Sequence, residues 1–203
     1  MTKSEHIPMP QRWFQKHFFP DWIVPSLEAL DFERLAAEGY KIAYLDIDNT
    51  LVFHGAHVGD DFARQTIQRV ADAGILPVIA SNAREPRARS FAASLDIPYV
   101  AEARKPSTKA LLADLKERGI APVDALMLGD QLLTDVWSGK RCGMAVVLTE
   151  RRGKREICTV RLKRGIEWLI IRLGGLGHWK RRYETDASTL RARGEARARR
   201  TCG

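Results

Sequence analysis

The amino-acid sequence predicts an α/β fold, with a Rossmann-like, doubly wound sheet of five parallel strands and helices on both faces. Short apolar runs alternate with helical patterns between residues 41 and 149, and this alternation is typical of a parallel sheet. Hydrophobic residues make up 45% of the 203 residues. That content suffices for one core with extensions, while the length is short for two full domains.

The expected elements follow one another along the chain. Residues 9–25 are rich in aromatic side chains and interrupted by three prolines, so we expect short helical pieces there. Ser26 can cap a helix that runs to about Gly39. After it we expect strands at residues 41–47, 75–81, 97–100, 125–130 and 144–149, and helices at residues 60–73, 84–95, 107–118 and 132–141.

Composition divides the chain into four predicted regions. They are an aromatic N-terminal arm (1–25), an α/β domain (26–150), a basic amphipathic helical segment (151–183) and a basic tail (184–203). The tail is rich in Arg and Ala and has almost no large apolar residues, so we expect it to be disordered, although it could fold on a partner.

Charge is distributed unevenly along these regions. The net charge is −3 for residues 1–150, +9 for residues 151–183 and +2 for residues 184–203. Basic residues gathered behind the predicted core favour a polyanionic partner, either an anionic membrane surface or nucleic acid.

The segment 151–183 has the pattern of one apolar helix face flanked by basic residues and tryptophans. The apolar positions are Leu162, Ile166, Leu169, Leu173 and Leu176. A basic amphipathic helix of this kind suits docking on anionic lipid, and the aromatic arm could add a second contact. The apolar face could equally cover the sheet while the charges stay solvated. Both interpretations remain open.

Cysteine usage and apolar segments indicate the compartment. The three cysteines have no paired spacing, which argues against a zinc ribbon or a disulfide framework and suits a reducing cytosol. The N-terminus lacks the apolar core of a signal peptide, and "IEWLIIRL" is too short and too charged to cross a bilayer. We therefore expect a cytoplasmic protein, with peripheral attachment to the inner face of the membrane as an option.

Polar residues follow three of the predicted strands. Asp46 and Asp48 come at the end of the first, Ser81 and Asn82 after the second, and Asp130 after the fourth. Ligands of open α/β sheets bind beyond the carboxyl ends of the strands, so these side chains should meet in one crevice. Neighbouring aspartates repel each other, and a hard cation such as Mg²⁺ can hold them ionised together.

Lys105 lies in the segment "ARKPS", just before a predicted helix, and could aim its ammonium into this crevice. A lysine, a hydroxyl and a metal around one point can hold a phosphoryl group. One of the two paired aspartates could then attack phosphorus, and the other could protonate the leaving oxygen and later activate water.

Four segments carry a family resemblance. "DIDNT", "ASN", "RKPS" and "GDQLLTD" resemble, in order, the four motifs of the haloacid-dehalogenase-like (HAD-like) phosphohydrolases, over roughly residues 20–175. Their wording most resembles the subfamily IIIA branch that includes phosphatidylglycerophosphate phosphatases. The DxDxT motif alone is less specific than all four motifs in this order.

The resemblance implies a role for each catalytic position. Asp46 would be the nucleophile that forms an aspartyl-phosphate and would also bind the metal. Asp48 would be the acid/base, with its main-chain carbonyl on Mg²⁺. Lys105 would pair with Asp46 and with the phosphate.

The resemblance also implies supporting roles. Ser81, with Asn82 beside it, would bind the phosphoryl oxygens, and Thr50 would brace the turn at the phosphate site. Asp130 would ligate Mg²⁺, and Asp135 would support the metal shell.

The spacing of the motifs leaves no room for a large cap domain. Only about ten residues separate Thr50 from Asp60, and one helix and one strand fill the interval from Asn82 to Lys105. The site should therefore be open, with only the flap "LVFHGAHVG" near it. An open site suits a phosphate displayed on something large, although a second copy of the chain could also supply a lid.

The sequence thus predicts a Mg²⁺-dependent phosphomonoester hydrolase, with phosphatidylglycerophosphate as the expected substrate and a phospholipid headgroup as the expected partner. A nucleic-acid 3′-phosphatase or a phosphatase of soluble sugar phosphates is the enzymatic alternative. An RNA- or ribosome-associated binding protein on the same scaffold is the alternative from another class.

Overall fold

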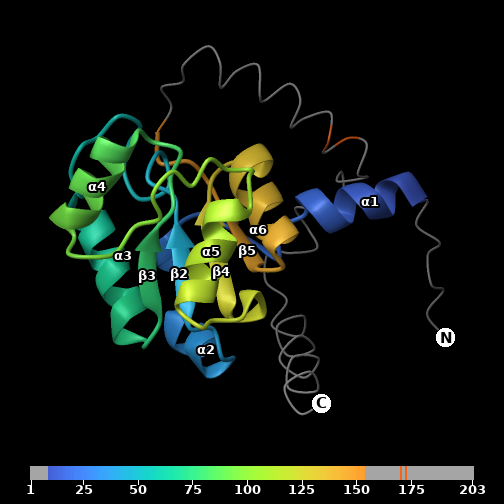
Figure 1. Ribbon diagram of the computed structural model, residues 1–203, viewed down its shortest axis with the longest axis horizontal. Helices are drawn as coiled ribbons and strands as arrows, with labels where there is room; N and C mark the ends of the chain where they lie inside the picture. Colours follow the sequence, from blue (N-terminus) through green and yellow to red (C-terminus); the bar gives the residue numbers. More distant parts are fainter. Residues whose placement is uncertain (1–8, 154–169, 171, 173–203) are drawn as a thin grey trace.

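The computed structural model describes residues 9–153, 170 and 172. Within them, five parallel strands form one sheet in the order β1-β5-β4-β2-β3 (Figure 1). The strands are β1 (Trp22–Val24), β2 (Ile42–Leu45), β3 (Leu76–Ile79), β4 (Ala125–Gly129) and β5 (Ala145–Thr149). The predicted α/β class and the doubly wound parallel sheet are confirmed. The predicted tail, and all of the basic segment except residues 151–153, 170 and 172, lie outside the described residues.

Helices cover both faces of the sheet. One face is covered by α2 (Phe32–Ala37), α3 (Asp61–Asp72) and α4 (Glu85–Ser94), and the other by α5 (Lys109–Glu117) and α6 (Trp137–Cys142). The helix α1 (Met9–Phe18) packs beside α6, on the side of the molecule away from α3 and α4 (Figure 1).

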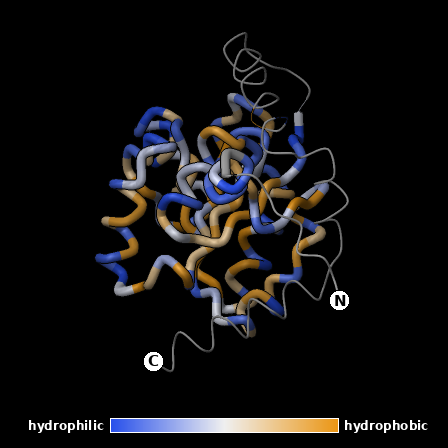
Figure 2. The backbone as a smooth tube through the Cα atoms, turned by 90° about the vertical axis from the view of Figure 1, so that its right-hand side faces the viewer, coloured by the Kyte–Doolittle hydropathy of each residue, from blue (hydrophilic) through white to orange (hydrophobic). Residues whose placement is uncertain are grey.

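Side chains along the strands alternate between two cores. In β2, Ala43 and Leu45 belong to the core beneath α2, α3 and α4, whereas Ile42 and Tyr44 belong to the core beneath α5. Successive side chains of a strand point to opposite faces, so a strand covered on both faces is apolar at every position. Figure 2 shows hydrophobic and hydrophilic stretches alternating along the chain. The helices bury only some of their positions, for example Ala63, Ile67 and Val70 of α3.

Three of the predicted helices are found within two residues of their expected ends, namely α3, α4 and α5. The Asp60 carboxylate accepts a hydrogen bond from Ala63 N at 2.9 Å and thereby caps α3. The fourth predicted helix, at residues 132–141, divides into a π-helical turn, η3 (Leu132–Val136), and α6.

The single helix expected from Ser26 to Gly39 is wrong. Ser26 caps only a short 3₁₀ turn, η1 (Leu27–Ala29), and the backbone is extended at Leu30. Asp31 then accepts a hydrogen bond from Arg34 N at 2.9 Å and begins α2. Two residues of the capping type stand close together, and the chain starts a separate helical element at each.

The strand predicted at residues 97–100 is also wrong, because only an isolated bridge joins Tyr99 to Ile79. The sheet instead contains β1, a strand that was not predicted. It lies in the predicted N-terminal arm and pairs with β5. Asp21 fixes it in place. One carboxylate oxygen of Asp21 accepts from Val146 N at 2.7 Å, and the other accepts from Lys140 Nζ at 2.6 Å.

Where short helical pieces were expected, the described part of the aromatic arm (residues 9–25) has one helix, α1, followed by β1. Phe18 is buried, and its ring centroid lies 5.2 Å from that of Trp137. Trp13, on the same helix, is 52% exposed. The arm therefore packs on the domain through its C-terminal end. No helix in the described part of the chain is long and apolar enough to span a membrane.

Candidate active site

The site lies at the carboxyl ends of β2 and β4, which are neighbours in the sheet. The strand order reverses between them, because β3 lies beyond β2 and β5 lies beyond β4. Asp46 follows β2 and Asp130 follows β4, and Asp46 N donates to Leu128 O at 3.0 Å. Such a switch point is where open α/β sheets bind ligands. The structure thus brings Asp46 and Asp130 together, as predicted from the strand ends.

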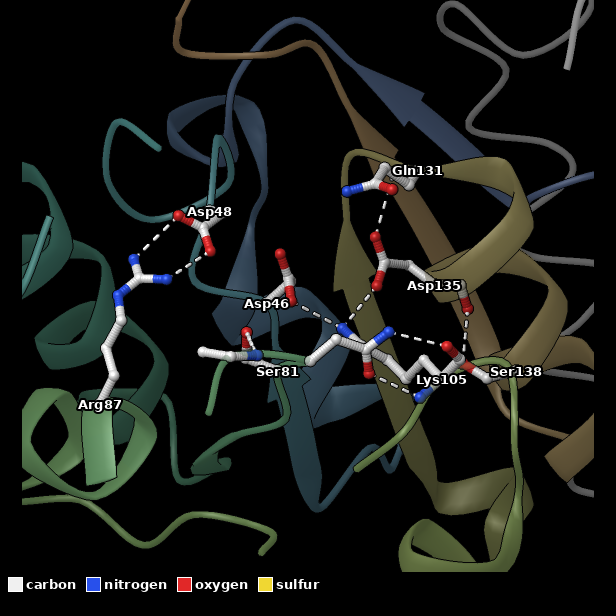
Figure 3. A network of polar contacts seen from close by, with 10 residues as sticks. Asp46, Asp48, Ser81, Arg87, Lys105, Gln131, Asp135 and Ser138 are labelled. Atoms are coloured by element: carbon white, nitrogen blue, oxygen red, sulfur yellow. Dashed lines mark hydrogen bonds and ion pairs between the residues drawn. The ribbon is translucent and has the colours of Figure 1, made fainter. Parts of the chain in front are cut away.

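Lys105 lies between two carboxylates. Its Nζ donates to Asp46 Oδ1 at 2.8 Å and to Asp135 Oδ1 at 2.5 Å (Figure 3). The Lys105 side chain is 1% exposed. Burial alone would lower the pKa of Lys105, but Asp135 and Asp46 outweigh burial and raise that pKa above its usual range. A permanent positive charge therefore stands beside Asp46.

The loop that carries Lys105 is held by Asn82. The Asn82 side-chain amide donates to Lys105 O at 2.7 Å, and its oxygen accepts from Lys105 N at 2.6 Å. Arg104, which precedes Lys105, has a left-handed backbone with φ 44°, and the peptide bond from Lys105 to Pro106 is cis. Asn82 was predicted to bind phosphate. In the structure its amide pairs with the main chain of Lys105, and phosphate binding by Asn82 stays a prediction.

Asp46, Asp130 and Asp135 form a buried acidic cluster. Each offers one oxygen, and these oxygens lie within 4.8 Å of one another. Among the described residues neither carboxylate oxygen of Asp130 has a hydrogen-bond partner, and only Oδ2 lies near a cation, 2.9 Å from Arg151 Nε. The buried Oδ1 is costly unless a further cation joins it. Carboxylate oxygens are the ligands that hard divalent cations prefer. The residues present therefore fit a metal ion.

Asp135 is positioned by its own turn. Its Oδ2 accepts from Gln131 N at 3.0 Å (Figure 3). A Cβ at Gly129 would lie 2.3 Å from the carboxyl carbon of Asp135. Only glycine at this position lets the Asp135 side chain cross the end of β4.

Crowding of these carboxylates perturbs their ionisation. Burial raises the pKa of Asp46 to about 6, against the lowering effect of Lys105. Burial raises the pKa of Asp130 to about 8, with Asp135 and Asp46 adding to the rise. In the metal-free protein the cluster therefore holds protons at pH values where free aspartates have lost them.

Two arginines at the start of the basic segment belong to the site region. Arg151 Nε lies 2.9 Å from Asp130 Oδ2, as an ion pair without hydrogen-bond alignment. Arg152 N donates to Asn49 O at 3.0 Å, and the Arg152 side chain pairs with Asp60. Part of the positive charge that follows β5 thus lies against the site.

Asp48 points away from Lys105, toward Arg87 of α4 (Figure 3). Arg87 donates to its two carboxylate oxygens at 2.7 and 2.8 Å, and Gly55 N donates to it at 2.8 Å. Burial would raise the pKa of Asp48, but the Arg87 and Gly55 hydrogen bonds outweigh burial, so that the pKa lies below its usual value. The Asp48 carboxylate is not part of the acidic cluster, and its predicted metal contact, through the main-chain carbonyl, stays a prediction.

Ser81 and Thr50 are buried at the same edge of the sheet. Ser81 Oγ accepts from Ala83 N at 3.2 Å, which leaves its hydroxyl hydrogen for another acceptor. Thr50 Oγ1 is buried without a hydrogen-bond partner among the described residues. The binding of phosphate by these two hydroxyls stays a prediction.

Comparison with known proteins gives the family. Residues 102–161 match the HAD-hydrolase-like family model. The probable phosphatase YqeG of Bacillus subtilis strain 168 is 31% identical over 157 residues, which cover 77% of this chain and 91% of that protein. The chain belongs to the HAD-like hydrolases. This HAD-like hydrolase is a phosphatase, and its acidic cluster can hold a metal ion.

Solved structures show weaker similarity. The HAD phosphatase from Thermococcus onnurineus is 17% identical, with a TM-score of 0.42 over 58% of this chain and 90% of its own. The 3-deoxy-D-manno-octulosonate 8-phosphate phosphatase from Moraxella catarrhalis, solved with magnesium, phosphate and KDO, is 16% identical, with a TM-score of 0.44 over 71% and 92%. At this level no ligand or substrate is transferred to the present HAD-like phosphatase.

Arg87, Arg151 and Gln131 contact the site of this HAD-like phosphatase but were not predicted from its sequence. The Gln131 contact uses a main-chain N–H, which any residue but proline offers. For Arg87 there was a signal: a carboxylate at a strand end that stays ionised needs a cation nearby. Three arginines between residues 84 and 89 were candidates for this cation. Which of them faces Asp48 depends on the exact start and rotation of the helix, which the sequence pattern does not give.

Proposed function

We propose that this protein is a Mg²⁺-dependent phosphomonoesterase that works through an aspartyl-phosphate on Asp46. The observation that supports this best is the bridge formed by Lys105 between Asp46 and Asp135, beside the metal-compatible cluster. A cation fixed next to a carboxylate aligns the carboxylate and attracts a phosphoryl group to it.

The proposed reaction has two steps. Asp48, ionised at rest beside Arg87, would first take a proton from solvent when it leaves Arg87. An Asp46 oxygen attacks phosphorus, the bond from phosphorus to the leaving oxygen breaks, and Asp48 gives that oxygen its proton. Asp48, now ionised, takes a proton from water, and the water oxygen attacks the aspartyl-phosphate. Inorganic phosphate leaves, and both carboxyl groups return to their starting states.

The chain's own residues would assist both steps. Lys105 would neutralise charge on the phosphoryl oxygens, and Ser81 and Thr50 would donate to them. The Asp46 and Asp130 carboxylates, the Asp48 main-chain carbonyl and, in support, Asp135 would hold Mg²⁺. When bound, Mg²⁺ would supply positive charge against the phosphoryl group.

Phosphatidylglycerophosphate is the substrate we propose, with phosphatidylglycerol and phosphate as the products. The intervals from Thr50 to Asp60 and from Asn82 to Lys105 hold only the flap, α4 and one short bridge, so they contain no cap domain. A site without a cap suits a phosphate on a lipid headgroup at a membrane surface. The net positive charge that follows residue 150 and the exposed Trp13 support approach to an anionic bilayer.

A phosphate-release screen tests the proposal, with Mg²⁺ and with lipid, nucleic-acid 3′-phosphate and sugar-phosphate substrates. We expect the highest kcat/KM on phosphatidylglycerophosphate in anionic vesicles, and loss of turnover by at least about 10³-fold in Asp46→Asn. Circular dichroism of the variant would show that the fold is kept. Faster turnover of a nucleic-acid end or a soluble sugar phosphate would overturn the substrate, and full activity of Asp46→Asn would overturn the mechanism.

A further inference from the structure

Arg87 joins three segments at the edge of the site. It lies in the first turn of α4, pairs with Asp48 through two hydrogen bonds, and donates from Nε and Nη2 to Ala56 O at 3.1 and 2.8 Å. Its side chain is 17% exposed and that of Asp48 is 15% exposed. The pair is thus largely shielded from water.

In this arrangement Asp48 is not ready for proton transfer. Both of its carboxylate oxygens accept hydrogen bonds from Arg87, and the carboxyl group points away from Lys105 (Figure 3). To reach a leaving oxygen, Asp48 must give up at least one of these bonds. The guanidinium would then be left half-buried and short of an anion, which is unfavourable unless another anion replaces the carboxylate.

The path of the leaving group passes this point. In-line attack by Asp46 puts the leaving oxygen on the far side of phosphorus. Because Asp48 has to contact that oxygen, whatever is attached to the oxygen runs beside Asp48 and therefore beside Arg87. Arg87 is also near enough to Asp46 for that carboxylate to contribute to the raised pKa of Arg87, after the larger effect of Asp48.

We infer that Arg87 recognises a second anionic group, carried on the leaving-group side of the substrate, and exchanges Asp48 for it. The exchange frees Asp48 for proton transfer only when a doubly anionic substrate is bound. This inference rests on the proposed function, because the leaving group of phosphatidylglycerophosphate carries a phosphodiester across one glycerol. A guanidinium binds such a group with the same two-pronged geometry that it uses here for a carboxylate.

Steady-state kinetics with two soluble probes test the inference. One is deacylated phosphatidylglycerophosphate, whose leaving group carries the phosphodiester, and the other is glycerol 3-phosphate, whose leaving group is uncharged. The variants are Arg87→Gln and Arg87→Lys. Arg89→Gln is the matched control, because Arg89 lies on the same helix but pairs with Glu85 and Tyr99 instead.

The wild type should prefer the deacylated lipid in kcat/KM. Arg87→Gln should lower kcat/KM for this probe about 10- to 100-fold more than for glycerol 3-phosphate, Arg87→Lys should lose part of the preference, and Arg89→Gln should keep it. If Arg87→Gln lost kcat/KM equally on both probes, or if the wild type showed no preference, this inference would be overturned and the proposed function would still stand. If the wild type hydrolysed p-nitrophenyl phosphate but neither probe, the proposed substrate would fall as well.

Discussion

At the scale of single residues, Lys105 stabilises two buried carboxylates at once. In Lys105→Met, Asp46 and Asp135 would lose their shared cation, and breaking a buried pair in this way costs about 3–5 kcal/mol. We expect that loss in the free energy of unfolding, measured by urea denaturation, together with loss of turnover. Lys109→Met, at an exposed position four residues away, should change neither. Unchanged stability of Lys105→Met would show that the lysine is not the counter-ion of the cluster.

The site could be predicted from sequence where it depends on residues at strand ends. Asp46 and Asp130 follow neighbouring parallel strands, and the geometry of the sheet alone brings such ends together. The contact between Arg87 and Asp48 could not be predicted in this way, because it joins residues 39 apart and depends on the phase of α4. Asn82 was recognised as a site residue, but its pairing with the main chain of Lys105 depends on a loop conformation that no local pattern encodes.

At the scale of elements, the central strands were predicted and an edge strand was not. The strands β2 and β4 are buried on both faces and show continuous apolar runs, which sequence patterns detect well. The edge strand β1 has three residues between two prolines, too few to display a period. The segment 97–100 has an apolar run too, but Tyr99 makes only an isolated bridge, and the chain turns away at residue 101.

The attachment of β1 should depend on Asp21. Asp21→Ala would leave Val146 N–H and the Lys140 ammonium without this partner, at the buried junction of β1 and β5. We expect a loss of about 2–4 kcal/mol in the free energy of unfolding, and faster amide exchange in β1 and β5. For comparison, Asp31→Ala removes only the cap of α2 and should cost about 1 kcal/mol. Equal effects of the two substitutions would contradict the role given to Asp21.

At the scale of the whole molecule, stability should depend on pH and on Mg²⁺. The pKa values of Asp46 and Asp130, about 6 and about 8, exceed that of an unfolded aspartate, so the folded metal-free protein binds more protons than the unfolded chain. Between pH 4 and pH 8, the free energy of unfolding of the metal-free protein should therefore be largest near pH 4. It should fall as the pH rises to about 8, by at most about 1.4 kcal/mol per pH unit for each of the two groups.

Mg²⁺ should reverse this trend, because it competes with protons for the same oxygens. Thermal unfolding in EDTA and in Mg²⁺, from pH 5 to pH 8, checks both statements, and the increase in Tm on adding Mg²⁺ should be larger at pH 8. Asp130→Asn should flatten the profile in EDTA and weaken the response to Mg²⁺. A metal-free protein that became more stable between pH 5 and pH 8 would contradict the expected ionisation of the cluster.

Contacts in the structure cross two of the predicted region boundaries. The sheet takes residues 22–24 from the predicted arm, and Arg151 and Arg152 from the predicted basic segment lie against the site. Region boundaries based on composition miss such contacts, because composition does not distinguish an arginine that pairs with a buried carboxylate from an arginine in solvent. The role of the remaining basic residues in lipid binding stays a prediction.

The placement of β1 also bears on how copies of the chain avoid one another. Without β1, the outer side of β5 would present a row of unsatisfied main-chain donors and acceptors, and such an edge recruits any extended segment that can pair with it. The three residues of β1 therefore protect the edge of β5 from pairing with another copy of the chain. A chain shortened past residue 25 should retain the acidic cluster of Asp46, Asp130 and Asp135, and two such chains should tend to associate through the exposed edge of β5.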